Sequence, residues 1–161
     1  MLRLLSLLVV LLLAGCAPKE PPPPPAPVKS ELELKREKFF GAAAAQDATI
    51  DWRSSGLGVK MLAPGEGVSP TASDKVRVHY TGTVADGTVF DDTRAKNKPA
   101  QFALSQLLRG MTEGIGYLKP GGRAVLYIPP SLGYGSMRAG SIPPVSGLTF
   151  DVELLEVLPR E

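Results

Sequence analysis

From about Gly56 to the end of the chain, apolar and polar residues alternate in short runs that are separated by Gly, Pro and Asp. A period of two places the apolar side chains of each run on one face of a β-strand. Asp86-Gly87 adds a hairpin signal between two apolar positions, Val84 and Val89. Strands that are buried on one face only predict an antiparallel sheet. The alternating runs are 76–81, 101–104, 123–128 and 148–154.

One helix is expected among these strands. Met111, Ile115 and Leu118 recur at helical spacing, and Pro120-Gly121-Gly122 would end the helix. The resulting fold class is α+β: an antiparallel five- to six-stranded sheet wrapped around one short helix, over residues 56–161.

Residues 30–55 are expected to form a helical stalk segment ahead of this domain. Ser30 and Glu33 have the spacing of a capping box, which would start a helix that runs to about Gln46. Phe39 and Phe40 belong to a loose apolar stripe that could rest on the domain. The segment is too short to indicate a dimerisation module.

The N-terminal residues 1–15 have the parts of a signal peptide: Arg3, a short apolar run and a small-residue exit. The apolar run is shorter than the roughly 20 residues that a membrane-spanning helix needs. The segment Leu13-Ala14-Gly15-Cys16 resembles the lipobox of bacterial lipoproteins, in which the cysteine is lipidated after cleavage. The alternative is an ordinary secretory leader that ends near a cysteine. Ala17 at the next position goes, in such lipoproteins, with export to the outer membrane.

Residues 16–29 then form a linker that contains seven of the 16 prolines. Proline favours an extended polyproline II conformation, so the linker would span on the order of 35 Å as a semi-rigid spacer. Such a spacer would lift a domain away from a membrane surface. A docking ligand for a proline-reading domain is the alternative.

Composition and motifs exclude several classes of function. The net charge is only +2, which does not support nucleic-acid binding. Because Cys16 is the only cysteine, neither an internal disulfide nor a cysteine-based metal site can form. No P-loop, dinucleotide glycine pattern or zinc-ligand spacing occurs. Ser131 lacks the context of a nucleophile elbow, and His79, the only histidine, fits a surface position on a strand. We therefore expect no cofactor, no metal and no hydrolytic machinery.

A series of short motifs from about Gly56 to Leu158 resembles the FKBP domain of the macrolide-binding immunophilins. Each motif is weak alone, but their order and spacing are specific. They are Val78-His79-Tyr80-Thr81-Gly82, Asp86-Gly87 with Phe90-Asp91, Asn97-Lys98-Pro99, Gly110-Met111-Thr112-Glu113-Gly114, Pro120-Gly121-Gly122-Arg123, Leu132-Gly133-Tyr134-Gly135, Ile142-Pro143-Pro144 and Leu148-Thr149-Phe150-Asp151 with Val152-Glu153-Leu154-Leu155.

The resemblance implies a peptidyl-prolyl cis/trans isomerase that helps exported envelope proteins to fold. Its partners would be unfolded or extended polypeptides that contain proline, together with macrolides such as FK506-like compounds or rapamycin. The implied catalytic residues are Tyr80, Phe90, Asp91 and Tyr134, and the implied substrate-binding residues are Leu107, Leu108, Met111, Ile142 and Phe150. Without the resemblance, the aromatic residues among them would more often be core residues than ligand contacts.

The chain departs from the family pattern at two positions. Ala100 follows Pro99 where an aromatic residue is common, and Met111 stands where the family often has Trp. Ala100 should widen one wall of the pocket, and Met111 should keep its floor apolar but adaptable. These departures motivate the main alternative, a catalytically weak FKBP-like chaperone. A third hypothesis, supported only by the proline-rich linker, is a structural lipoprotein whose domain is a spacer. In each case the expected location is the bacterial cell envelope, with a lipid on Cys16 in the outer membrane and the domain facing the periplasm.

Overall fold

The alternating runs form one antiparallel sheet in the computed structural model, which describes residues 29–159. Within these residues, seven strands follow the order β1-β2-β6-β7-β3-β4, and β5 also pairs with β3. The expected five or six strands are exceeded because β1 is a two-residue strand, too short for an alternation to reveal. The strands are β1 (Asp51–Trp52), β2 (Gly58–Ala63), β3 (Lys75–Val84), β4 (Val89–Asp92), β5 (Ala100–Ala103), β6 (Arg123–Ile128) and β7 (Leu148–Leu158).

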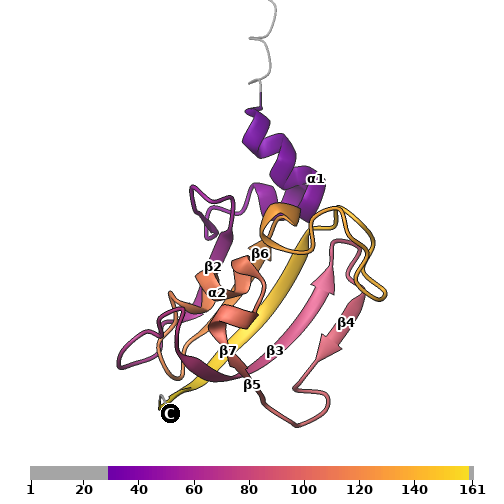
Figure 1. The fold of residues 1–161 in the computed structure, drawn as a ribbon. Helices are drawn as coiled ribbons and strands as arrows, with labels where there is room; N and C mark the ends of the chain where they lie inside the picture. Colours follow the sequence, from indigo (N-terminus) through magenta and orange to yellow (C-terminus); the bar gives the residue numbers. More distant parts are fainter. Residues whose placement is uncertain (1–28, 160–161) are drawn as a thin grey trace, which may run out of the picture.

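The helix α2 (Arg109–Ile115) lies on one face of the sheet, against β6 (Figure 1). The inward side chains of the strands and the inner face of α2 form one buried core. The alternation predicted these inner positions correctly: Ala124, Leu126 and Ile128 of β6 are fully buried. The prediction that the helix includes Leu118 was wrong, because α2 ends at Ile115 and Leu118 enters the core from the following turn.

Strand β3 organises the functional side of the sheet. Along one edge it pairs with β7 over its whole length, from Lys75 to Val84. Along the other edge it pairs first with β5, over residues 75–78, and then with β4, over residues 81–83. Two short 3-10 helices, η1 (Leu104–Gln106) and η2 (Pro130–Leu132), follow β5 and β6. The expected strand over 101–104 therefore ends at Ala103.

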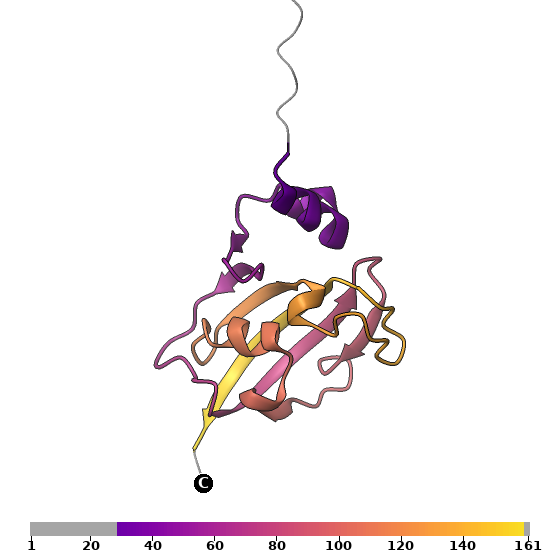
Figure 2. The same cartoon turned by 45° about the horizontal axis from the view of Figure 1, so that its top comes forward.

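The helix α1 (Glu31–Ala45) stands at one end of the sheet (Figures 1 and 2). Its capping box is present, since the Ser30 side chain accepts from the Glu33 N–H and the Glu33 carboxylate accepts from the Ser30 N–H. Gly41 interrupts the helix with a φ of 82°, and the Phe40 ring just before it packs against Trp52 and Tyr127 at 5.7 and 5.6 Å between centroids. This aromatic contact holds α1 to the domain.

The expected signal peptide, the lipidated Cys16 and all but the last residue of the proline-rich linker lie outside the described residues. Among residues 29–159, no helix combines the length and the apolar character needed to cross a membrane.

Candidate functional site

A cavity of about 600 Å³ opens between α2, β3, β4 and the loop that precedes β7. All nine residues that the sequence resemblance assigned to a pocket line this one cavity. Tyr80 comes from β3, Phe90 and Asp91 from β4, and Phe150 from β7, while the others come from α2 and from loops. The full lining is Tyr80, Phe90, Asp91, Phe102, Gln106, Leu107, Leu108, Met111, Tyr134, Ala139, Gly140, Ser141, Ile142 and Phe150.

Aromatic rings form the wall of the cavity on the strand side. Phe90 and Phe150 meet edge to face, with 5.5 Å between centroids and 82° between planes. Tyr80 lies 6.0 Å from Phe150 and 6.1 Å from Phe102. Gly82 makes room for this arrangement, because a Cβ there would come within 2.6 Å of the Phe90 ring. The wall is therefore aromatic, closely packed and apolar.

The helix α2 provides the floor. Met111 is buried, with 3% of its surface exposed, and its side chain faces the cavity. Leu108 is the N-cap residue of α2, and it has no side chain that could cap the helix. No acceptor among residues 29–159 takes a hydrogen bond from the Leu108 N–H. The first turn of the helix thus presents a backbone donor beside an apolar floor.

A polar pair interrupts the aromatic wall. The Tyr80 hydroxyl donates a hydrogen bond to the Asp91 carboxylate. Lys96 Nζ lies 2.6 Å from the other carboxylate oxygen, and the backbone N–H of Asp92 donates to that oxygen as well. The hydrogen bond from Lys96, and next the one from Tyr80, lower the pKa of the Asp91 carboxyl below its ordinary value. Burial, together with the carboxylate, raises the pKa of the Tyr80 hydroxyl well above its ordinary value. At neutral pH the pair is therefore a carboxylate held by a protonated tyrosine.

Tyr134 and the loop that follows it form the opposite rim. The Tyr134 hydroxyl has no hydrogen-bond partner within the described part of the chain. The base of the loop is closed by two backbone hydrogen bonds, Gly135 N–H to Pro130 O at 2.9 Å and Val145 N–H to Gly135 O at 2.9 Å. At its tip, Ala139 and Ile142 form an isolated antiparallel bridge. Tyr134 thus holds a free hydroxyl at the edge of the apolar cavity.

Five lining residues were not assigned individually by the resemblance, although it implies that the loop from Gly135 to Pro144, which contains three of them, leans over one rim of the pocket. The strand alternation could have indicated Phe102, because it shares the inner face of its run with Leu104. Local periodicity did not indicate the other four, one of which belongs to η1 and three of which belong to the rim loop. Ala100, which was expected to widen one wall, is not among the described lining residues. The four are Gln106, Ala139, Gly140 and Ser141.

The described residues contain no cluster of three or more His, Cys, Asp or Glu side chains that could hold a metal ion. His79 lies outside the cavity lining, and its Nδ1 is 3.0 Å from the Thr93 hydroxyl. The cavity therefore has the means to bind and orient an apolar group, with a few hydrogen bonds at its edge.

Comparison with known proteins agrees with this geometry. Residues 66–155 match the family model for "FKBP-type peptidyl-prolyl cis-trans isomerase". The chain is 43% identical over 122 residues to a "Probable FKBP-type peptidyl-prolyl cis-trans isomerase" of Haemophilus influenzae, covering 75% of this chain and 51% of that protein. It is also 49% identical over 106 residues to "Peptidyl-prolyl cis-trans isomerase Fkbp12" of Drosophila melanogaster, covering 63% of this chain and 98% of that protein.

Among solved structures, the fold is similar to that of FkpA from Escherichia coli, with a TM-score of 0.71 and 41% identity. That match covers 80% of this chain and 58% of the FkpA chain. The chain thus spans about half the length of the bacterial relatives, while its domain matches nearly the whole length of the Drosophila protein. The family match extends over more than half of the chain. It includes all fourteen residues that line the cavity. The chain belongs to the FKBP-type peptidyl-prolyl cis-trans isomerase family.

Proposed function

We propose that this protein catalyses the cis/trans isomerisation of X-Pro bonds in extended segments of other proteins. The observation that carries the proposal is the apolar cavity, which combines an aromatic wall with two hydrogen-bond donors, the Leu108 N–H and the Tyr134 hydroxyl, that have no acceptor among residues 29–159. The proposed substrates are exported envelope proteins during folding.

The chemistry requires no nucleophile. Rotation about a peptide bond is slow because twisting removes the amide resonance, which leaves a barrier of about 18–20 kcal/mol. The twisted amide is less dipolar than the planar one, so transfer from water into an apolar cavity favours the transition state over the ground state. Binding the transition state more tightly than the substrate is what accelerates the reaction.

Each part of the cavity has a role in this mechanism. The proline ring would rest on Met111 between Tyr80, Phe90 and Phe150. The Leu108 N–H and the Tyr134 hydroxyl would donate to substrate carbonyl oxygens on either side of the rotating bond. When the substrate residues on both sides are fixed in this way, rotation is confined to the X-Pro bond between them.

Asp91 has a different role from the direct polarisation of a substrate carbonyl. An ionised carboxylate has no proton to donate to a carbonyl oxygen. Both of its oxygens already accept hydrogen bonds, one from Tyr80 and the other from Lys96 and the Asp92 N–H. We therefore assign to Asp91 the orientation of Tyr80 at the wall of the cavity.

A protease-coupled assay on a proline tetrapeptide tests the proposal, with the full chain purified in detergent. Tyr134→Phe should lower kcat/KM by about tenfold, because the loss of one hydrogen bond at an apolar site corresponds to about 1–2 kcal/mol. Tyr117→Phe is the matched control, since Tyr117 is exposed outside the cavity and its hydroxyl contacts only Glu113 at 3.4 Å. No acceleration by the unmodified chain, or equal activity of the two variants, would contradict the proposal.

The alternative of a weakly catalytic chaperone is not favoured. It was motivated by Ala100 and Met111, but Ala100 is not part of the described cavity lining and Met111 is buried as an apolar floor. Suppression of aggregation that survives Tyr134→Phe, with no isomerase activity in the parent chain, would support the alternative.

We also propose that Cys16 carries the lipid that anchors the protein in the cell envelope, in the outer membrane with the domain facing the periplasm. The support is the sequence Leu13-Ala14-Gly15-Cys16 with Ala17 after it. Stable anchoring requires at least two acyl chains, as a lipidated N-terminal cysteine provides. Labelling with radioactive palmitate and fractionation of the two membranes test this, because Cys16→Ala should lose both the label and the membrane association. A labelled Cys16→Ala variant would refute it.

Binding of macrolides is a further proposal, supported by the apolar character and the size of the cavity. Because Met111 is adaptable and smaller than the Trp often found there in the family, we expect FK506-like compounds and rapamycin to bind less tightly than to a family member with Trp. Titration calorimetry with the full chain measures this affinity.

A further inference from the structure

Strand β3 has a gap in its pairing at Tyr80, which belongs to the aromatic wall of the cavity. Its edge pairs with β5 up to Val78 and with β4 from Thr81 onward. Tyr80 lies between these two ladders, so on that edge its backbone N–H and C=O have no partner within the described strands. A buried backbone group without a partner is destabilising, so something else must bond to it.

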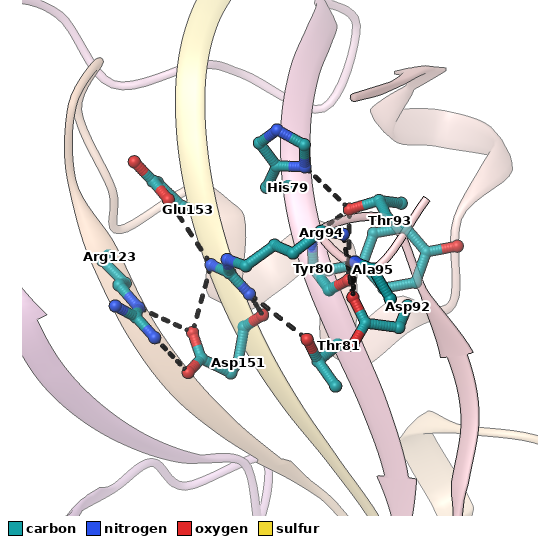
Figure 3. Close-up of polar contacts among 10 residues, drawn as sticks. All are labelled: His79, Tyr80, Thr81, Asp92, Thr93, Arg94, Ala95, Arg123, Asp151 and Glu153. Atoms are coloured by element: carbon teal, nitrogen blue, oxygen red, sulfur yellow. Dashed lines mark hydrogen bonds and ion pairs between the residues drawn. The ribbon is translucent and has the colours of Figure 1, made fainter. Parts of the chain in front are cut away.

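Thr93 fills the gap, as Figure 3 shows. Its backbone N–H donates to Tyr80 O at 3.0 Å, and its hydroxyl donates to the same oxygen at 3.1 Å. The Tyr80 N–H donates to the Thr93 hydroxyl oxygen at 2.8 Å. The Thr93 side chain therefore takes the place of a strand carbonyl. Only 5% of Thr93 is exposed, so water cannot substitute for it.

The loop that carries Thr93 is fastened to the outer face of the sheet. The Asp92 carboxylate accepts from the backbone N–H groups of Arg94 and Ala95 at 2.8 and 3.0 Å, which sets the turn. The Arg94 guanidinium crosses β3 and donates to the backbone and side chain of Asp151 at 3.2 and 3.3 Å (Figure 3). Arg123 holds Asp151 from the other side through two hydrogen bonds. Thr93 thus occupies a fixed place.

Tyr80 is held at both its backbone and its hydroxyl. Thr93 fixes the Tyr80 backbone from outside the cavity, and Asp91 accepts the hydrogen bond from the Tyr80 hydroxyl inside it. Asp91 lies in β4 and Thr93 comes directly after the strand, so the two contacts are made by residues only two positions apart.

We propose that Thr93 is a positioning residue of the site, which acts on the reaction through Tyr80 although it does not line the cavity. This rests on the isomerase function proposed above. The hydroxyl is the essential group: serine can replace threonine, whereas valine, which has the same shape, leaves the Tyr80 N–H unpaired.

Activity measurements on a double-mutant cycle test the positioning role. Thr93→Val should lower kcat/KM by about fivefold, mostly through kcat, and Thr93→Ser should stay within about twofold of the parent. In a Tyr80→Phe background, which lacks the hydrogen bond to Asp91, Thr93→Val should lower kcat/KM by less than about twofold further. The loss of thermal stability caused by Thr93→Val should be the same in both backgrounds. Thr83→Val is the matched control, because Thr83 lies on β3 like Tyr80 but is not part of the cavity lining, and its hydroxyl donates to Thr149 O on β7.

An equal activity loss from Thr93→Val in both backgrounds would overturn the proposal, because the effect would then be general destabilisation. NMR on protein labelled with 13C-tyrosine gives a readout that does not depend on catalysis. The Tyr80 ring signal, assigned from its absence in Tyr80→Phe, should move in Thr93→Val and stay in place in Thr93→Ser and Thr83→Val. If the parent chain has no isomerase activity but Thr93→Val still moves the Tyr80 signal, only the proposed function is refuted. If the parent chain is active but Thr93→Val leaves the Tyr80 signal in place, only the positioning role is refuted.

Discussion

Two glycines, four residues apart on α2, allow the helix to lie directly on β6. A Cβ at Gly114 would come within 2.6 Å of Leu126 Cδ2 and closer still to Cδ1, and a Cβ at Gly110 would come within 2.6 Å of Ile128. Leu126 is completely buried, so its side chain has no free space into which it could move. Gly114→Ala is therefore a test of whether this close approach matters for stability.

Two effects of opposite sign compete in this variant. Alanine is the better helix former, which stabilises by up to about 1 kcal/mol relative to glycine. An extra methyl group in a filled core forces side chains or backbone to shift and costs about 1–3 kcal/mol. Because the methyl group would meet Leu126 well inside contact distance, we expect the overpacking to dominate. The free energy of unfolding should fall by about 1–2 kcal/mol, which corresponds to a decrease in Tm of about 4–8 °C.

Equilibrium unfolding in urea measures this change, and a second substitution identifies its cause. Leu126→Ala alone should cost about 2–5 kcal/mol through the cavity that it leaves. Combined with Gly114→Ala, it should cost less than the sum of the two single variants by about 1 kcal/mol, since the new methyl group enters the vacated space. A stabilised Gly114→Ala variant, or strictly additive costs, would refute the reasoning.

Three further predictions concern separate parts of the molecule. Hydrogen bonds from Arg123 lower the pKa of the Asp151 carboxyl below its ordinary value, so their contribution to stability is complete above about pH 4 and is lost as the pH falls through the lowered pKa. When Tm is measured from pH 2 to 7, it should therefore decline less steeply on the acid side in Asp151→Asn than in the parent. Equal slopes would contradict this prediction. Met111→Trp should tighten macrolide binding by about tenfold in titration calorimetry, because a larger aromatic floor adds about 1 kcal/mol of contact, and an unchanged Kd would count against the assigned floor. Phe40→Ala should lower the free energy of unfolding by about 1 kcal/mol and leave kcat/KM unchanged. The fluorescence emission of Trp52, the only tryptophan, should shift to the red. An unshifted emission would show that α1 does not pack against Trp52.

Local periodicity predicted correctly which face of each strand is buried, but it did not predict where the helix and strands end. Val76, Val78 and Val152 were predicted to face inward and are fully buried. The helix was predicted to reach Leu118 because apolar spacing continues past its last turn, but the hydrogen bonding changes to turns at Gly116. An apolar residue can enter the core from a turn as well as from a helix, so spacing alone does not locate a helix end.

The nine pocket residues came from the family resemblance, and periodicity by itself assigned no ligand-binding role to any of them. The structure brings all nine to one cavity and adds Phe102, which had been treated only as a strand residue. It also changes the significance of Ala100, which shares a strand with Phe102 but is not part of the described lining. Whether a side chain on the inner face reaches the cavity or the core depends on what packs above it, and the strand pattern does not contain this information.

The sequence by itself determined the alternating strands, the capped N-terminal helix and the ordered motifs of the family, since each of these depends on neighbours along the chain. Only the tertiary structure decided that Thr93 completes the pairing of Tyr80 and that Gly114 lets α2 rest on Leu126. Both depend on contacts between segments that the chain brings together from a distance, where one hydroxyl or one missing methyl group has to fit a partner on another strand.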